Sequence, residues 1–248
     1  LPILKRLFLS ITKGEELRFL GHLDFLRTME RAVMRSEIPV AFSEGFNPHM
    51  KLSLDSALGV GVTADPLYLE IKLEEDMSTE EVRERLSRQL PRGITIHSIV
   101  EAEKNWPKFV AVFNEDAYEM EGPVKEGTGE KDFAEARTAL EEFNHLSSFL
   151  YKRVTPKKVR EMDVKPMILE PMKVTFTKDR AYLTFSLIRS NTGTVQPKDI
   201  WKMLAESFHM PWTEGEFICS RTGTYRRLNG KRLTLSDQGV FQGLLKGQ

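Results

Sequence analysis

The sequence predicts a mixed α+β protein in which two successive segments each follow the element order β-α-β-β-α-β. Apolar and polar residues alternate in several short runs, such as 67–73, which is typical of strands with one buried face. Other runs, such as 133–143, have apolar residues at helical spacing, and turn-forming residues separate the runs. This order corresponds to two tandem ferredoxin-like units, each expected to have an antiparallel sheet with its helices on one face.

The first segment has the clearest local signals. Its expected elements are a strand within 3–20 that turns at Gly14, a helix from His22 to about Glu37, strands at 52–54 and 67–73, a helix at 78–90 and a strand at 94–98. Ser78 and Glu81 have the spacing of a capping box, which favours the start of a helix at this point.

The second segment repeats the order with additional residues. Its expected elements are a strand at 109–113, a helix at 133–143, a hairpin of 172–176 and 181–187, a helix that begins at Pro197 and a strand at 217–219. No residue-level repeat relates the two segments, so the duplication is inferred from element order. The expected domains are 1–104, 105–220 with a basic insertion at 150–170, and a basic C-terminal tail at 221–248.

Composition limits the classes of function. Of the 248 residues, 40% are hydrophobic and 29% are charged, which is typical of a globular protein, and the formal net charge is zero. Affinity for nucleic acid would therefore have to come from clusters of basic residues. The single cysteine, Cys219, excludes a disulfide framework and a multi-cysteine metal or iron–sulfur site built from this chain alone. Because no long apolar run and no signal-peptide pattern are present, we expect a cytoplasmic protein without a membrane partner.

The segment 18–54 concentrates residues that could act chemically. Arg27, Arg31 and Arg35 recur every four residues, so a helix would place them in one stripe, with Arg18 just ahead of it. Such a stripe can follow the phosphates of a nucleic acid. The alternative is a solvated helix face on which neighbouring acidic residues form weak ion pairs.

His22, Asp24 and His49 are the candidate catalytic residues. An imidazole near a carboxylate can serve as a general acid or base, and His22 and Asp24 stand where the helix is expected to begin. Alternatively, Asp24 favours the positive end of the helix dipole and His22 is an ordinary polar turn residue. We expect no metal site, because His22 and Asp24 lack the i, i+4 spacing of a helical metal pair.

The loop 43–49 (SEGFNPH) is the most specific part of this segment. Gly45 permits positive φ, a proline restricts φ, and Asn47 readily forms local turns, so the loop is expected to be rigid. Gly45, Phe46, Asn47 and the nearby Lys51 are candidate binding residues, since an aromatic ring on a rigid loop beside arginines can stack on a base or a ligand ring. The alternative is that Phe46 is buried and pins the loop to the helix.

A second basic cluster lies at 151–160, in the expected insertion. Its proline-bounded cations could contact RNA or phosphate. The candidate binding residues here are Lys157, Lys158, Arg160, Asp163 and Lys165. The alternative is a solvated connection between the two halves of the domain. The tail adds five cations and no acidic residue between 220 and 235.

The runs LRFLGHLDFLRTMERAV, IPVAFSEGFNPHMKLSL and KKVREMDVKPMI resemble the radical-SAM-linked protein family. This is a domain of unknown function that is fused to, or encoded beside, radical SAM proteins. The resemblance covers most of residues 3–215, although Gly21 stands where the family pattern usually has a serine. The family's usual gene neighbourhood, among ribosome-assembly and RNase genes, implies RNA- or ribosome-associated work. A radical SAM enzyme needs three cysteines for its cluster, so this chain, with one, would be an accessory module.

We therefore expect an accessory or substrate-presenting partner of a radical SAM enzyme, associated with RNA or the ribosome and without an iron–sulfur cluster or other cofactor of its own. One alternative is an RNA-processing or RNA-modifying enzyme that uses His22, Asp24 and His49. Another is a small-ligand-binding module whose pocket is lined by the loop around Phe46. The sequence specifies no reaction, because phosphate-loop, dinucleotide-binding, zinc-protease and nucleophile-elbow motifs are all absent.

Overall fold

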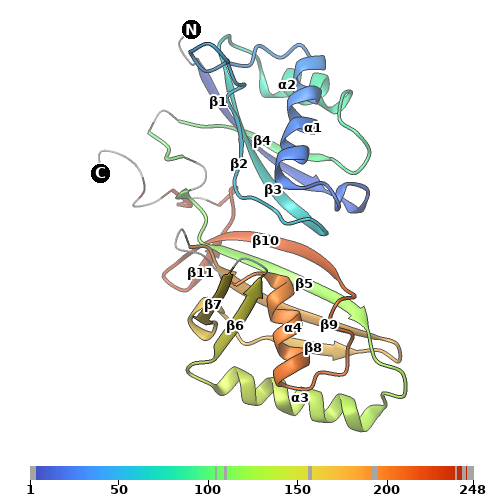
Figure 1. Cartoon of the computed structure of the whole chain (residues 1–248). Helices are drawn as coiled ribbons and strands as arrows, with labels where there is room; N and C mark the ends of the chain where they lie inside the picture. The colour runs from blue at the N-terminus through green and yellow to red at the C-terminus, as the bar shows by residue number, and fades with distance from the viewer. Residues whose placement is uncertain are drawn as a thin grey trace. The chain divides into compact units, whose positions relative to one another are not determined.

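The structure is a computed structural model, and it describes residues 4–103, 105–108, 111–155, 158–190, 195–237, 239–241 and 244. The chain divides into two compact units (Figure 1). Unit 1 comprises Leu1–Phe113 and Thr224–Gln248, and unit 2 comprises Asn114–Gly223. The fold is mixed α+β, dominated by antiparallel strands, and the described residues contain four α-helices, two in each unit. None of these helices is long and apolar enough to cross a membrane.

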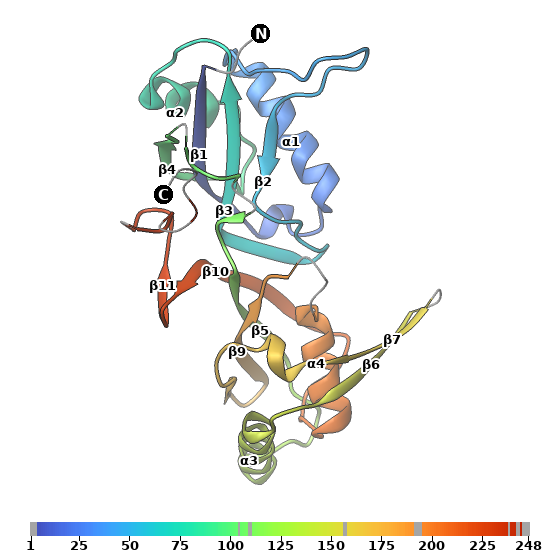
Figure 2. The same ribbon diagram turned by 90° about the vertical axis from the view of Figure 1, so that its left-hand side faces the viewer.

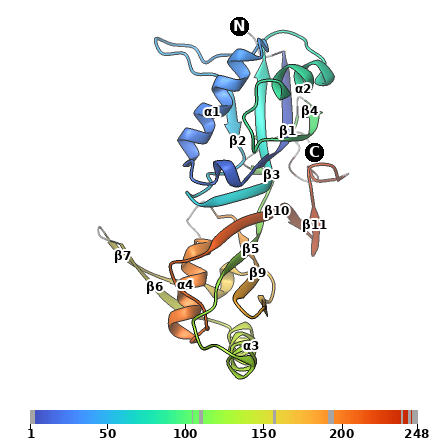
Figure 3. The ribbon, with the colours of Figure 1, turned by 90° about the vertical axis from the view of Figure 1, so that its right-hand side faces the viewer.

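Unit 1 places its elements in the order β-α-β-β-α-β along the chain. The elements are β1 (Lys5–Lys13), the short 3-10 helix η1 (Glu15–Leu17), α1 (His22–Arg35), β2 (Leu52–Leu54), β3 (Val62–Leu73), α2 (Thr79–Ser87) and β4 (Ile96–Glu101). The strands lie in the order β4-β1-β3-β2, and each neighbouring pair is antiparallel. Figure 3 shows α1 and α2 on the same face of these strands.

Alternate residues of β1 build two different cores. Leu7, Leu9 and Ile11 pack with the helix residues Phe25 and Met29, as expected when every second side chain of a strand points to the same face. The intervening Phe8 belongs to a second cluster that includes Val240 and Phe241 near the C-terminus. Both faces of β1 are therefore buried within unit 1.

The sequence had suggested a separate basic tail at 221–248, but the C-terminal residues from Thr224 onward are part of unit 1. β10 (Ile218–Leu228) carries the chain from unit 2 into unit 1 and pairs with β11 (Lys231–Leu233). Leu235, Val240 and Phe241 are buried, and the Trp106 ring stacks on Phe241 at 3.8 Å. These apolar contacts join the last residues to the core of unit 1. The prediction of a separate tail rested on the basic residues of this segment and did not consider its apolar ones.

The boundary between the units also differs from the expected division after residue 104. Val112 and Phe113 are buried in unit 1, and the Phe113 ring stacks on Tyr68 with the ring centroids 4.7 Å apart. Unit 1 therefore continues to Phe113, because these two side chains complete its second core.

The described residues of unit 2 also form two α-helices and an antiparallel sheet. Its elements are β5 (Glu115–Pro123), α3 (Glu130–His145), β6 (Leu150–Thr155), β7 (Lys158–Asp163), η3 (Lys165–Met167), β8 (Lys173–Phe176), β9 (Arg180–Ile188), α4 (Pro197–Ser207) and the first part of β10. The main strands are ordered β10-β5-β9-β8, whereas β6 and β7 form a separate two-stranded sheet. Figure 2 shows this β6–β7 hairpin extending away from α4. The expected basic insertion is thus a hairpin.

Helices were easier to predict than strands. Ser78 caps α2 as expected, because its Oγ accepts a hydrogen bond of 3.1 Å from the Glu81 backbone N–H. The strand expected at 109–113 is wrong for its described part, residues 111–113, and residues 109–110 lie outside the described range. The strand is instead β5, whose charged residues Glu115 and Asp116 are buried. A strand whose buried residues are charged lacks the alternation of apolar and polar residues by which strands are predicted.

Candidate functional site

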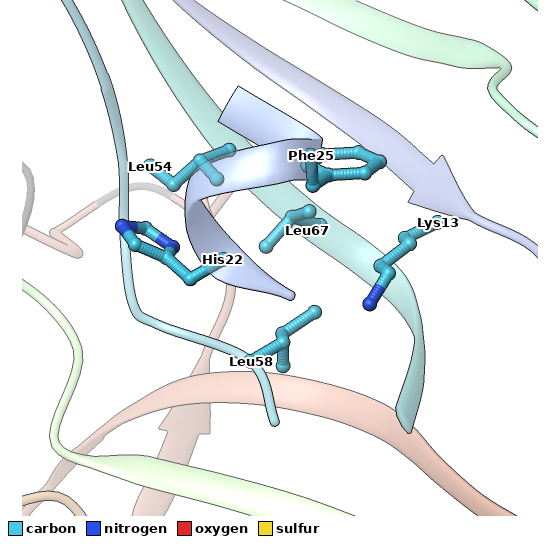
Figure 4. Close-up of a pocket in the computed structure, with 6 residues that line it drawn as sticks. All are labelled: Lys13, His22, Phe25, Leu54, Leu58 and Leu67. Carbon is cyan, nitrogen blue, oxygen red and sulfur yellow. The ribbon is translucent and has the colours of Figure 1, made fainter. Parts of the chain in front are cut away.

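The first turn of α1 places His22 beside a small pocket. Gly21 is the N-cap residue and provides no side-chain cap. The Nδ1 atom of His22 is buried and has no hydrogen-bond partner among the residues that the structure describes. Figure 4 shows the imidazole among the residues that line the pocket. These residues are Lys13, His22, Phe25, Leu54, Leu58 and Leu67. The pocket is therefore apolar apart from one amine and one imidazole.

Lys13 is the functional candidate that the sequence analysis missed. It ends β1 and is only 1% exposed, and its Nζ donates hydrogen bonds to the carbonyl oxygens of Leu20 at 2.9 Å and Arg18 at 3.4 Å. Burial lowers the pKa of Lys13 to about 8. A signal was present, since Lys13 follows Leu9 and Ile11 at the spacing of inward-facing strand residues.

Arg18 contributes its backbone to this site and its side chain to the surface. Its carbonyl oxygen accepts hydrogen bonds from Lys13 Nζ and from the Gly61 backbone N–H at 2.8 Å. Its guanidinium forms an ion pair with Glu15 at 2.6 Å and lies 4.7 Å from the centroid of the exposed Phe19 ring. The predicted role of Arg18 in binding a partner remains a prediction.

The arginine stripe of α1 exists, but its members differ in their contacts. Arg27 forms an ion pair of 3.3 Å with Asp24, and both side chains are mostly exposed. Arg35 Nη2 donates to the Gln89 carbonyl oxygen at 2.9 Å. Arg31 is exposed. Asp24 therefore pairs with an arginine at the surface and is not among the residues that line the pocket beside His22.

The loop 43–49 is closed by its own backbone. The Ser43 N–H donates to the His49 carbonyl oxygen at 2.7 Å, and the His49 N–H donates to Ser43 Oγ at 2.8 Å. Gly45 has a φ of 120°, which favours glycine. Phe46, Asn47 and His49 are exposed, so Phe46 does not pin the loop to α1. Lys51, just after the loop, is half-buried.

His22 and His49 lie near opposite ends of the sheet in unit 1. Lys13, which shares the pocket with His22, pairs with Ala64 of β3, whereas the Lys51 carbonyl oxygen accepts from the Lys72 N–H. Eight residues of a strand separate Ala64 from Lys72, or roughly 26 Å. Figure 2 shows the loop between α1 and β2 leaving the sheet near the C-terminal end of α1. The three candidate catalytic residues therefore do not form one site.

Two candidate binding residues of unit 2 serve as anchors. Asp163 Oδ1 accepts from the backbone N–H groups of Phe149 at 2.9 Å and Lys165 at 3.1 Å, and the bond from Phe149 is the main cause of a lowered pKa of Asp163. Lys165 Nζ donates to the carbonyl oxygens of Phe143 and Asn144, both at 3.1 Å, and burial lowers the pKa of Lys165. Together they tie the base of the β6–β7 hairpin to the end of α3.

Much of the rest of the hairpin is exposed and basic, although Tyr151 and Met162 are buried. Its register pairs Lys152 with Glu161, Arg153 with Arg160 and, nearer the tip, Val154 with Val159. Lys152 and Arg160 are exposed, and Val154 is 70% exposed. Arg153 donates to Gln196 Oε1 at 3.0 Å and lies 3.5 Å from an Asp199 carboxylate oxygen, so it connects the hairpin to α4. Lys157 and the side chain of Lys158 lie outside the described part of the chain.

A buried cluster of charges stabilises the interior of unit 2. Asp116 forms a bidentate ion pair with Arg189, at 2.6 and 2.7 Å, and its Oδ1 lies 3.6 Å from Arg221 Nη1. Arg221, which the sequence placed in the basic tail, is fully buried. Burial also raises the pKa of the Cys219 thiol to about 12, so this cysteine is not an activated nucleophile. Within the described part of the chain, no three His, Cys, Asp or Glu residues cluster as metal ligands.

Comparison with solved structures gives only distant likenesses. A chain of a Cbf5-Nop10-Gar1 complex has a TM-score of 0.41 at 7% identity over 87% of this chain, which spans 48% of that chain. An unknown protein from Galdieria sulphuraria has a TM-score of 0.26 at 14% identity, with 75% of this chain and 82% of that chain covered. At these scores, neither likeness supports a conclusion about function.

Comparison of sequences identifies a family but no characterised relative. No curated protein matches the chain. A bacterial family of uncharacterized proteins matches residues 6–197, which are 192 of the 248 residues. The chain therefore belongs to the family described as an uncharacterized protein conserved in bacteria (DUF2344).

Proposed function

We propose that the protein is an RNA-binding accessory module, and the observation that carries this proposal is the β6–β7 hairpin. From Leu150 to Asp163 the chain has five lysines and arginines against two acidic residues, a net charge of 5 − 2 = +3. Asp163 is already engaged by backbone N–H groups. A projecting, basic two-stranded ribbon can follow the phosphates of an RNA.

The geometry supports binding better than catalysis. His22 lines a pocket, Asp24 pairs with Arg27 at the surface, and His49 is in a loop near the other end of the sheet. An acid–base pair needs hydrogen-bond reach to a common substrate atom. Separate positions for the three residues therefore favour an accessory role over an RNA-processing enzyme.

We further propose that both units are ferredoxin-like and that the partner is a radical SAM protein. The strand orders in the two sheets, β4-β1-β3-β2 and β10-β5-β9-β8, support the fold. Along the chain, one helix follows the first of the four strands of each sheet and another follows the third. The resemblance of residues 18–54 to radical-SAM-linked proteins supports the partner. Co-purification of the radical SAM protein with this chain from the native organism tests the partner, and failure to recover it in repeated pull-downs would count against it.

RNA binding is tested by titrating a structured RNA at several salt concentrations. We expect Lys152→Glu/Arg160→Glu to weaken binding at least about tenfold and to reduce the salt dependence by one to two released ions, since each contacted phosphate releases about one counterion. The control is Lys131→Glu/Lys202→Glu, which changes the charge equally at exposed positions on α3 and α4. Equal losses in both variants would remove the hairpin from the interface, and absence of salt-dependent binding by the wild type would overturn the proposal.

A further inference from the structure

A second basic hairpin, β10–β11, lies in unit 1. Its two-residue turn consists of Asn229 and Gly230, whose positive φ angles of 50° and 76° are those that a type I′ hairpin turn requires. Four of the nine residues from 225 to 233 are lysine or arginine and none is acidic, a net charge of 4 − 0 = +4. The chain therefore concentrates positive charge in unit 1 as well as in the β6–β7 hairpin of unit 2.

One face of this hairpin attaches it to unit 1. Arg226 is only 7% exposed, and its Nη1 donates a hydrogen bond to the Val240 carbonyl oxygen. Leu233, which lies directly opposite Arg226, packs against the apolar cluster that contains Val240. Directly opposite residues of an antiparallel pair point to the same face. Arg226 is therefore a structural cation, and the other face of the hairpin does not serve as the anchor.

The other face carries Tyr225, Arg227 and Arg232. Tyr225 and Arg227 are two residues apart in β10, so they point to the same side, and Arg232 lies directly opposite Arg227. The guanidinium carbon of Arg232 lies 5.0 Å from the centroid of the Tyr225 ring, which is within the range of a cation–π contact. Arg232 is exposed, and Tyr225 and Arg227 are partly exposed. This face therefore presents two neighbouring guanidinium groups, one of which is held by an aromatic ring.

Two arginines in this arrangement suit a phosphate group. The Cβ atoms of directly opposite residues are roughly 5 Å apart, and like charges at such positions repel each other. A phosphate between the two guanidinium groups offsets this repulsion and accepts hydrogen bonds from both. Bases stack on aromatic rings and on guanidinium planes, and the Tyr225–Arg232 pair provides both beside the phosphate position. Phosphate and base together are the components of an RNA strand with unpaired bases.

We propose that the β10–β11 hairpin is a second RNA-binding surface, which takes an unpaired segment of RNA. Arg227 and Arg232 bind a phosphate group, and the Tyr225–Arg232 pair stacks on the adjacent base. Lys231, exposed beside the turn, adds a further cation for the next phosphate. The proposal rests on the RNA-binding function proposed above, to which it adds a site in the other unit and a class of RNA.

The test titrates the full-length protein with a fluorescein-labelled oligouridine, an unpaired RNA, at several salt concentrations. We expect Arg227→Gln/Arg232→Gln to weaken binding about tenfold and to lower the salt dependence by about one released ion, because charge-assisted hydrogen bonds to one phosphate are lost. The matched control, Arg88→Gln/Arg92→Gln, removes two exposed cations elsewhere on unit 1 and should leave the affinity almost unchanged. Equal losses in the two variants, or no loss in Arg227→Gln/Arg232→Gln, would overturn the proposal.

Two variants of Tyr225 separate stacking from charge. Tyr225→Leu removes the ring, so we expect the affinity for oligouridine to fall about two- to fivefold, the size of one exposed cation–π contact, with the salt dependence unchanged. Tyr225→Phe keeps the ring and should bind as the wild type does. Circular dichroism confirms that each variant is folded. Wild-type affinity in Tyr225→Leu would refute the stacking role of the ring.

Parallel titrations of the β6–β7 variant Lys152→Glu/Arg160→Glu distinguish failure of this inference from failure of the proposed function. If that variant weakens the binding of structured RNA and Arg227→Gln/Arg232→Gln changes neither RNA, only the second surface is refuted. Absence of oligouridine binding by a wild type that binds structured RNA has the same meaning. If the wild type binds neither RNA, both proposals fail. Equal losses of Arg227→Gln/Arg232→Gln for oligouridine and for a fully paired duplex would refute the preference for unpaired RNA.

Discussion

The two units bury basic groups in different ways. In unit 2, one carboxylate, that of Asp116, contacts both Arg189 and Arg221, so charge is balanced by charge. In unit 1, Lys13 is equally buried, and among the described residues its Nζ donates to two backbone carbonyl oxygens and lies 5.8 Å from the centroid of the Phe25 ring. A paired buried charge is costly to separate and therefore holds the fold in place. Burial without a carboxylate partner lowers the pKa of an amine, so Lys13 loses its proton more easily than an exposed lysine does.

Lys165 is intermediate between these two cases. Like Lys13, it donates to two carbonyl oxygens, those of Phe143 and Asn144. Unlike Lys13, it has a nearby carboxylate, Asp163, whose charge opposes the effect of burial on its pKa. The carbonyl groups belong to the end of α3, where a cation is favoured by the helix dipole. We infer that Lys165 keeps its positive charge more readily than Lys13 does.

The largest expected effect comes from removing the charge of Asp116. Asp116→Asn leaves two buried guanidinium groups without their carboxylate, and we expect the free energy of unfolding to fall by about 3 kcal/mol. Urea denaturation measures the change. The control Glu84→Gln breaks the exposed pair with Arg88 and should cost less than about 1 kcal/mol. Comparable losses in the two variants would show that the ion pairs of Asp116 contribute no more to the free energy of unfolding than an exposed ion pair does.

The second effect is a pH dependence that belongs to Lys13. Its pKa is lowered to about 8 by burial, so between pH 8 and the ordinary value of 10.5 the unfolded chain binds more protons than the folded one. The wild type should therefore gain stability relative to Lys13→Met as the pH rises through this window, by on the order of 2 kcal/mol. Below pH 8 the difference between the two should be constant.

Urea denaturation of both proteins from pH 7 to 10.5 measures this difference. Other groups that titrate in this range contribute equally to both proteins and cancel. A difference in stability that does not change between pH 8 and 10.5 would show that Lys13 keeps its proton in this range. The buried basic groups of both units would then be charged.

The smallest expected effect concerns Lys165. Lys165→Met removes two hydrogen bonds to the carbonyl oxygens at the end of α3, and we expect a loss of about 1 kcal/mol in the free energy of unfolding. Lys131→Met, at an exposed position of the same helix, should change stability by less than about 0.5 kcal/mol. If Lys165→Met were neutral, the residue would be free to contact RNA, as the sequence suggested.

Local patterns predicted much of the fold but little of the candidate site. Apolar residues at helical spacing indicated α3, and the Ser78 capping box indicated α2. These features depend on neighbours within a few residues. β5 was missed because its buried Glu115 and Asp116 depend on partners far along the chain. Lys13 was missed for a different reason: lysines are seldom buried, and although its spacing from Leu9 and Ile11 was a signal, only the fold around η1 brings the carbonyl oxygens of Arg18 and Leu20 to its Nζ.

By itself, the sequence determined the mixed α+β class, the helices, membership of an uncharacterized bacterial family and the presence of basic clusters. All of these depend on residue type and short-range spacing. The tertiary structure decided which charged side chains remain available to contact a partner. It buried Arg221 beside Asp116, engaged Asp163 and Lys165 at the base of a hairpin, and separated His22 from His49. The physical reason is that the charge state and reach of a side chain depend on its solvent and its partners, which only the folded chain brings together.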